Sequence, residues 1–239
     1  MASTADGTGY WLATGTGAVS AHGSVHQLGN TASLALAAPI VKIVADPTGL
    51  GYWEVAADGG IFAFGTAHFE GAASSVALTA PIVNMVPTAD GLGYWEVAAD
   101  GGVFTYGDAA FAGSLGATHE TVPTVGLVAS ASTGCYWLVA ADGTATAFNA
   151  PTIGPTPSTP TIEPVVDVGA SASGKGFWEV TRAGNVYAYG DAAFQGPSGV
   201  PNPNAPINEV TADPATGGYW LVGADGGVYA FGSPFYGAG

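Results

Sequence analysis

The chain has 239 residues, and 48% of them are apolar, including ten Tyr, ten Phe and six Trp, which is ample for a buried core. Charged residues make up only 9%, and three basic residues stand against 18 acidic ones, for a net charge of −15. Such a surface repels phosphate backbones, so we expect no nucleic-acid partner. No run of 18 apolar residues occurs, so we expect no membrane insertion.

The second sequence repeat serves as the template for the predicted elements. Residues 39–45 are apolar and β-branched and predict a first strand, and Asp46-Pro47-Thr48-Gly49 is turn chemistry. A second strand is predicted at 52–57, a type I′ hairpin turn at Asp58-Gly59, and a third strand at 61–64. We expect a short fourth strand at His68-Phe69-Glu70. No segment has a helical period with caps.

Residues 51–65 (Gly-Tyr-Trp-Glu-Val-Ala-Ala-Asp-Gly-Gly-Ile-Phe-Ala-Phe-Gly) return almost unchanged at 93–107, and weaker copies surround the other tryptophans. Successive tryptophans are 42 residues apart, except for 41 between Trp137 and Trp178. The first strand recurs at 81–86, 123–128, 164–168 and 206–210. A repeat of this length is one supersecondary unit that cannot bury its apolar face alone.

We therefore predict an all-β fold, a six-bladed β-propeller of four-stranded antiparallel blades of about 42 residues each. The single domain spans 1–239, with blades at approximately 1–38, 39–80, 81–122, 123–163, 164–205 and 206–239. The phase of the two ends fits a closed ring of six, and a fragment of a larger ring would have the same phase.

The order of strands and turns in each repeat is similar to WD40 blades, although Phe64-Gly65 or Tyr106-Gly107 stands where those blades have Trp-Asp. More closely, Gly-Tyr-Trp-Glu/Leu-Val-x-Ala-Asp-Gly-Gly-Val-Phe-x-Phe-Gly-Asp-Ala resembles a tandem repeat of secreted and surface proteins of actinobacteria, often attached to cell-wall hydrolases or peptidases. The resemblance covers essentially the whole chain. It implies an extracellular or cell-surface location, although residues 1–30 do not have the pattern of a signal peptide.

Two sets of polar residues stand out at equivalent repeat positions. The fourth position of the first strand varies from copy to copy, and its side chains could meet around a central channel and bind a polar ligand; the alternative is a water-filled channel with compensating charges. These axial candidates are Lys42, Asn84, Asp167 and Glu209. The second set replaces leucine in the second strand and could face a ligand between blades, or else bond to water or neighbouring backbone N–H groups. These acids are Glu54, Glu96 and Glu179.

The tryptophans at the repeat position are predicted to be structural, because burying one indole removes roughly 200 Å² from water. They are Trp11, Trp53, Trp95, Trp137, Trp178 and Trp220. A platform for stacking sugars is the alternative role.

No catalytic, cofactor or metal motif is present in the sequence. Residues 169–176 nearly match a phosphate-binding loop but lack the Ser or Thr after Lys175 and lead into a strand. His22 and His26 would lie some 13 Å apart along a strand, and Cys135 has no second cysteine to pair with.

The sequence favours a monomeric, non-enzymatic binding module, with a cell-envelope carbohydrate or protein as its ligand. One alternative is a structural spacer domain of a secreted hydrolase or peptidase with no ligand of its own. Another is a propeller glycosidase that uses paired carboxylates such as Asp167 and Glu209, although the repeats have none of the long insertions expected of an enzyme.

Overall fold

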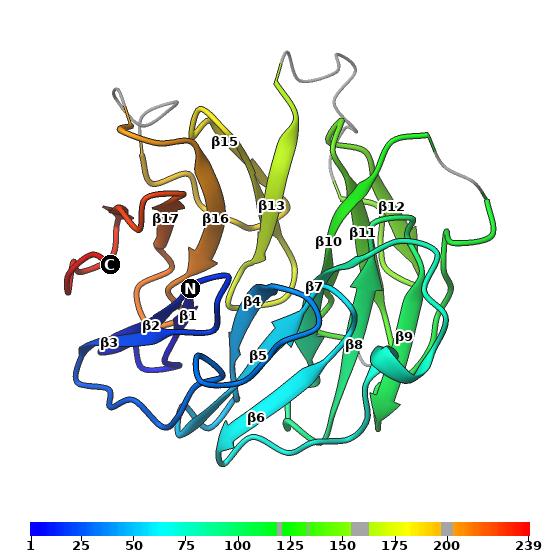
Figure 1. Ribbon diagram of the computed structural model, residues 1–239. Coiled ribbons are helices and arrows are strands. Elements are labelled where there is room, and N and C mark those ends of the chain that lie inside the picture. Colours follow the sequence, from blue (N-terminus) through cyan, green and yellow to red (C-terminus); the bar gives the residue numbers. More distant parts are fainter. Residues whose placement is uncertain (119–120, 133, 154–162, 197–202) are drawn as a thin grey trace.

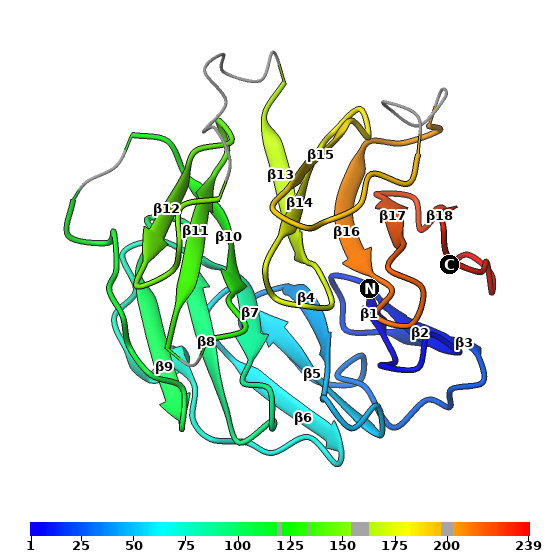
Figure 2. The ribbon, with the colours of Figure 1, turned by 180° about the vertical axis from the view of Figure 1, so that it is seen from behind.

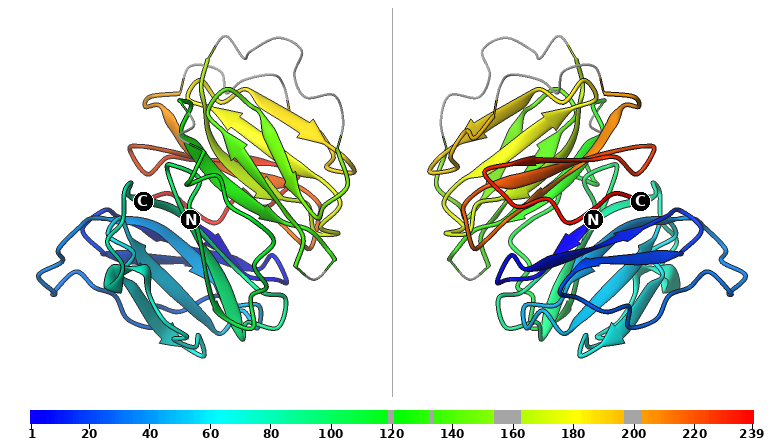
Figure 3. Two further views of the ribbon diagram at one scale, coloured as in Figure 1. Left: turned by 90° about the vertical axis from the view of Figure 1, so that its right-hand side faces the viewer. Right: turned by 90° about the vertical axis from the view of Figure 1, so that its left-hand side faces the viewer.

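The computed structural model describes residues 1–118, 121–132, 134–153, 163–196 and 203–239. Within them the chain forms six three-stranded antiparallel sheets and one short 3-10 turn, η1 (Ala73–Ser75). The sheets follow one another around a common centre (Figures 1 and 2), and the first and second halves of the chain lie on opposite sides of it (Figure 3). The predicted all-β class and the six repeated sheets are confirmed. None of the described helices is long and apolar enough to cross a membrane.

Each sheet consists of an inner, a middle and an outer strand, in chain order. The inner strands are β1 (Ala2–Ser3), β4 (Ile40–Ala45), β7 (Ile82–Pro87), β10 (Thr124–Ala129), β13 (Val165–Ala170) and β16 (Ile207–Ala212). The middle strands are β2 (Gly9–Ala13), β5 (Gly51–Ala56), β8 (Gly93–Ala98), β11 (Tyr136–Ala140), β14 (Phe177–Thr181) and β17 (Tyr219–Gly223). The outer strands are β3 (Val19–Gly23), β6 (Ile61–Gly65), β9 (Val103–Gly107), β12 (Ala145–Phe148), β15 (Val186–Tyr189) and β18 (Val228–Phe231).

The inner strands line the centre of the molecule. β4, β7, β10, β13 and β16 contact one another in that order, and β1 contacts both β4 and β16. Each of the five longer inner strands has a bulge at one equivalent position; in β4, Ile40 pairs with Ala56 and Lys42 with Val55, so Val41 is the extra residue. Bulges redirect the side chains that follow them, and these bulges stand immediately before the predicted axial residues.

The hairpin turn differs from the predicted type I′ turn. Gly59 has φ of +82°, but Asp58 is not in the left-handed region. Gly59 N–H donates to the carbonyl of Ala56 (2.9 Å), and Ala56 N–H to that of Gly60 (2.8 Å). The loop is thus one residue longer than a two-residue hairpin, and only the glycine needs a positive φ. Asp58 Oδ1 accepts a hydrogen bond from Gly60 N–H (3.0 Å).

The fourth strand predicted at residues 68–70 is not formed, because this segment does not pair with any strand of a sheet. Instead, this segment joins two sheets through side chains. Trp53 of its own sheet donates from Nε1 to the carbonyl of His68 (2.7 Å), and the hydroxyl of Tyr94 in the next sheet accepts from Glu70 N–H (3.1 Å) and donates to the carbonyl of Gly71 (2.5 Å). These side chains form hydrogen bonds with the backbone of the segment that a fourth strand would otherwise form within a sheet. In the described residues each blade therefore has three strands.

All six indoles are buried between sheets, with at most 4% of each residue exposed. Each packs on an aromatic ring at the start of the next middle strand, with centroids 5.2 to 6.0 Å apart. The pairs are Trp11–Tyr52, Trp53–Tyr94, Trp95–Tyr136, Trp137–Phe177, Trp178–Tyr219 and Trp220–Tyr10. The last pair joins the sixth sheet to the first in the same way as the others.

Candidate functional site

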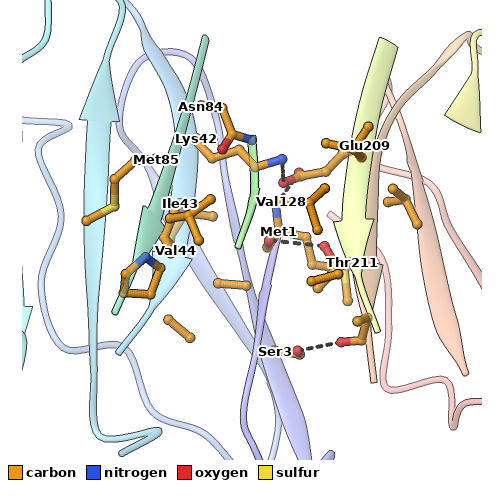
Figure 4. Close-up of a pocket in the computed structure, with 18 of the residues that line it drawn as sticks. Met1, Ser3, Lys42, Ile43, Val44, Asn84, Met85, Val128, Glu209 and Thr211 are labelled. Atoms are coloured by element: carbon orange, nitrogen blue, oxygen red, sulfur yellow. Dashed lines mark hydrogen bonds and ion pairs between the residues drawn. The ribbon is translucent and has the colours of Figure 1, made fainter. Parts of the chain in front are cut away.

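Three of the predicted axial residues meet at the centre of the molecule. Lys42 on β4 extends its Nζ to 2.8 Å from Asp167 Oδ2 on β13 and to 2.8 Å from Glu209 Oε1 on β16. Asp167 Oδ2 also accepts a hydrogen bond from Val210 N–H (3.0 Å), and the amino group of Met1 contacts Glu209 Oε2. We call Lys42, Asp167 and Glu209 the axial cluster (Figure 4 shows Lys42 and Glu209).

Burial and charge act in opposite directions on the axial cluster. Burial alone would lower the pKa of Lys42, but the Asp167 and Glu209 carboxylates outweigh it, so the pKa is raised and the ammonium is retained. Burial would raise the pKa of Glu209, but Lys42 and the Met1 amino group outweigh it, so this pKa is lowered. The pKa of Asp167 is raised, mainly by burial, against the opposing effect of Lys42. The cluster holds its own compensating charges.

The fourth predicted axial residue, Asn84 on β7, lies beside Lys42 but outside these ion pairs (Figure 4). It is 3% exposed, and its Oδ1 has no hydrogen-bond partner among the described residues. The equivalent position on β10 is Gly126, where an added Cβ would come within 3.2 Å of Asn84 Nδ2 and 2.7 Å of Val168. The absence of a side chain at Gly126 therefore leaves room for the Asn84 amide.

The axial cluster separates two cavities along the centre. The narrow axial cavity, about 250 Å³, lies toward the ends of the inner strands, where Ala170 and Pro214 are exposed. Its walls are apolar, with Ile43, Met85, Val128 and others, and its polar end holds Lys42, Asn84 and Glu209 (Figure 4). The wide axial cavity, about 1010 Å³, lies toward the starts of the inner strands and the hairpins between middle and outer strands.

The wide axial cavity has a mainly apolar wall above a charged floor. The wall includes Val41, which is 40% exposed, and the exposed Asn208, and the floor is the axial cluster. Hairpin residues, including Asp225, form part of its rim. This shape suits a ligand that covers apolar surface and reaches polar groups at depth.

The inter-blade acids lie apart from these cavities. Glu54, Glu96 and Glu179 are fully buried, and none of them lines either axial cavity. Glu54 Oε2 accepts a hydrogen bond from Thr31 N–H (2.9 Å), and both oxygens of Glu96 accept from Ala73 N–H (3.2 and 3.4 Å).

These hydrogen bonds come from the segment that links the preceding sheet to the sheet of the acid. They match the alternative role given above for these acids, in which they bond to neighbouring backbone N–H groups. For Glu179 the corresponding segment falls within residues 154–162, outside the described part of the chain. Burial raises the pKa of Glu54, and it raises the pKa of Glu96 and of Glu179 to about 8.

Several features of the site were not anticipated from the sequence. They include the pairing of Lys42 with Asp167 across the centre, the backbone N–H of Val210 as a partner, and the division into two cavities. The repeat pattern indicates which position faces the centre but not which blades exchange hydrogen bonds. In the described residues, no group of three or more His, Cys, Asp or Glu side chains is placed to hold a metal ion.

The fold defined by these sheets is that of a β-propeller. The structure is similar to the crystal structure of the Cps50 (Swd1) β-propeller domain of Myceliophteria thermophila, with a TM-score of 0.58 at 12% sequence identity, over 98% of this chain and 82% of that one. No family model matches the chain, and no curated protein matches it either. At this identity the likeness establishes the fold.

Proposed function

We propose that this chain is a non-enzymatic binding module that holds its ligand at the wide axial cavity. The observation that carries the proposal is a cavity of about 1010 Å³ whose wall is largely apolar and whose floor carries charged groups. Ligand sites in proteins combine these properties, with apolar surface for affinity and a few polar groups for orientation. The resemblance of the repeat to secreted and surface proteins of actinobacteria supports an extracellular or cell-surface location and a cell-envelope carbohydrate or protein as ligand.

The arrangement of the axial carboxylates argues against a glycosidase. Catalysis by a carboxylate pair requires one acid and one base or nucleophile facing the substrate. Asp167 and Glu209 instead share the ammonium of Lys42, and Asp167 also accepts the Val210 N–H. Both carboxylates are engaged in holding inner strands together.

A spacer domain with no ligand is the second candidate, and the self-compensating axial cluster favours it. Because Lys42 and the Met1 amino group balance the two carboxylates within the protein, the charges need no external partner. The two candidates differ in whether the wide axial cavity is used.

An array of cell-envelope glycans and proteins, probed with the full chain, tests the proposal. Binding should be lost in Val41→Lys, which places a charged side chain on the wall of the wide axial cavity. The matched control is Leu92→Lys, because Leu92 is 52% exposed on a turn outside both axial cavities. Retained binding in Val41→Lys contradicts the cavity as the site, and an array without binding supports the spacer.

A further inference from the structure

The polar end of the narrow axial cavity offers one neutral hydrogen-bond acceptor and one donor that are not used within the described residues; Glu209 Oε1, which also has no hydrogen-bond partner there, is held by its ion pair with Lys42. The acceptor is Asn84 Oδ1, in a residue only 3% exposed, with no partner among the described residues. The donor is Lys42 Nζ: its ammonium carries three N–H groups, of which one donates to Asp167 Oδ2, and Nζ forms an ion pair with Glu209 Oε1. Asn84 and Lys42 both line this cavity.

A buried carbonyl oxygen without a partner is costly, because its desolvation is not compensated. A single water could satisfy it, but a cavity of about 250 Å³ has room for several times the roughly 30 Å³ that one water occupies in the liquid. The rest of the wall offers little to further waters, since it consists mainly of apolar side chains such as Ile43, Met85 and Val128. The two hydroxyls on the wall, those of Ser3 and Thr211, already donate to backbone carbonyls. The cavity therefore fits a larger molecule with one polar end.

We infer that the narrow axial cavity binds a neutral, mostly apolar molecule or side chain that carries a single hydroxyl or primary amide group. Such a head both donates, to Asn84 Oδ1, and accepts, from Lys42 Nζ. A cationic head would face the ammonium of Lys42, and an anionic head would face Glu209. A saccharide would place its many hydroxyl groups against apolar walls without partners.

The source of the head group is either a free small molecule or a side chain of a partner protein. The cavity is reached at the end of the inner strands where Ala170 and Pro214 are exposed, so either could enter. This site is separate from the wide axial cavity on the other side of the axial cluster, and the two can be tested independently.

The test is a titration of the full chain with 1-butanol, butyramide, n-butylammonium and butyrate, read from the side-chain amide signal of Asn84 in nitrogen–proton correlation spectra. We expect 1-butanol and butyramide to shift that signal with saturation, and the two charged probes to bind at least about fivefold more weakly. Asn84→Leu should weaken 1-butanol binding, followed on other signals of the cavity, by about fivefold or more, the loss of one neutral hydrogen bond. Asn208→Leu, the same substitution on the wall of the wide axial cavity, should leave it unchanged.

A charged probe that binds as tightly as 1-butanol would overturn the inference, and so would a signal that no probe shifts up to about 100 mM, which indicates bound water alone. These outcomes need no variant, so they hold even if Asn84→Leu fails to fold. A blocked peptide with a central glutamine, compared with butyramide, separates a partner side chain from a free ligand. Array ligands that bind while these probes do not would overturn this inference and leave the proposed function intact.

Discussion

Lys42 Nζ lies 2.8 Å from Asp167 Oδ2, although the two residues are 125 positions apart and their strands, β4 and β13, belong to sheets three places apart around the centre. The pair joins opposite sides of the molecule at the point where the two axial cavities meet. Lys42 also binds Glu209 on β16, so one side chain holds three inner strands.

Replacing Lys42 with methionine should therefore lower the free energy of unfolding by about 3 to 5 kcal/mol, because two largely buried carboxylates lose their shared cation. Urea denaturation at pH 7 measures the change. The control is Lys42→Met combined with Asp167→Leu, which removes one cation and one carboxylate, leaves Glu209 paired with the Met1 amino group, and should recover most of the loss. A Lys42→Met variant as stable as the wild-type chain would show that the axial cluster does not contribute to stability.

Trp95→Ala should cost about 3 to 5 kcal/mol, because it removes a 4%-exposed indole from the seam with Tyr136 and leaves a cavity. Phe111→Ala is the matched aromatic control, since Phe111 is 60% exposed, and it should change stability by no more than about 0.5 kcal/mol. Thermal and urea unfolding both report the difference. Equal effects of the two substitutions would contradict a cohesive role for the indoles.

The inner and middle strands could be predicted from the sequence because β-branched runs and a regular period specify them locally. The absence of a fourth strand could not be predicted, because the segment at His68 resembles a short strand in sequence, and its hydrogen bonds to Trp53 and Tyr94 are long-range. The type I′ turn was predicted wrongly because Asp-Gly is also compatible with a longer loop in which only Gly59 takes a positive φ.

The axial site was predictable as a set of positions and not as a set of contacts. Variation at the fourth position of the first strand identified Lys42 and Asp167. Side chains from all blades converge at this position, so different residues are needed in different blades, although the rest of the repeat is nearly uniform. The pairing of Lys42 with Asp167 depends on the reach of the side chains across the centre and on the bulge at Val41. The sequence pattern of one repeat does not show either of these. The room for the Asn84 amide likewise depends on Gly126 of the neighbouring inner strand, which the repeat position alone does not indicate.

Tyr94→Phe should lower the free energy of unfolding by about 1 kcal/mol or somewhat more. The substitution keeps the ring against Trp53 but removes the hydroxyl that bonds Gly71 and Glu70, leaving their backbone groups without this partner. Tyr187→Phe is the control, because Tyr187 is 38% exposed and its loss of a hydroxyl should have little effect. If hydrogen exchange at Glu70 N–H does not accelerate in Tyr94→Phe, the segment at 68–71 is held by other contacts.

Stability should fall as the pH rises from about 5 to 8, because of the buried inter-blade acids. Burial raises the pKa of Glu96 and of Glu179 to about 8, from 4.5 for an exposed carboxyl, so the folded state keeps protons that the unfolded chain releases in this window. The stabilisation is fully present below pH 4.5 and is lost as the pH rises through the pKa of about 8. Each such group contributes up to about 1.4 kcal/mol per pH unit.

Glu96→Gln combined with Glu179→Gln should flatten this dependence, because an amide is neutral at every pH and its oxygen can still accept the Ala73 N–H. Urea midpoints at pH 5, 6.5 and 8 measure the slope. Glu70→Gln is the control: Glu70 is exposed, so its substitution should leave the slope unchanged. A wild-type chain as stable at pH 8 as at pH 5 would mean that Glu96 and Glu179 ionise inside the seams at no cost, through hydrogen bonds strong enough to offset their burial.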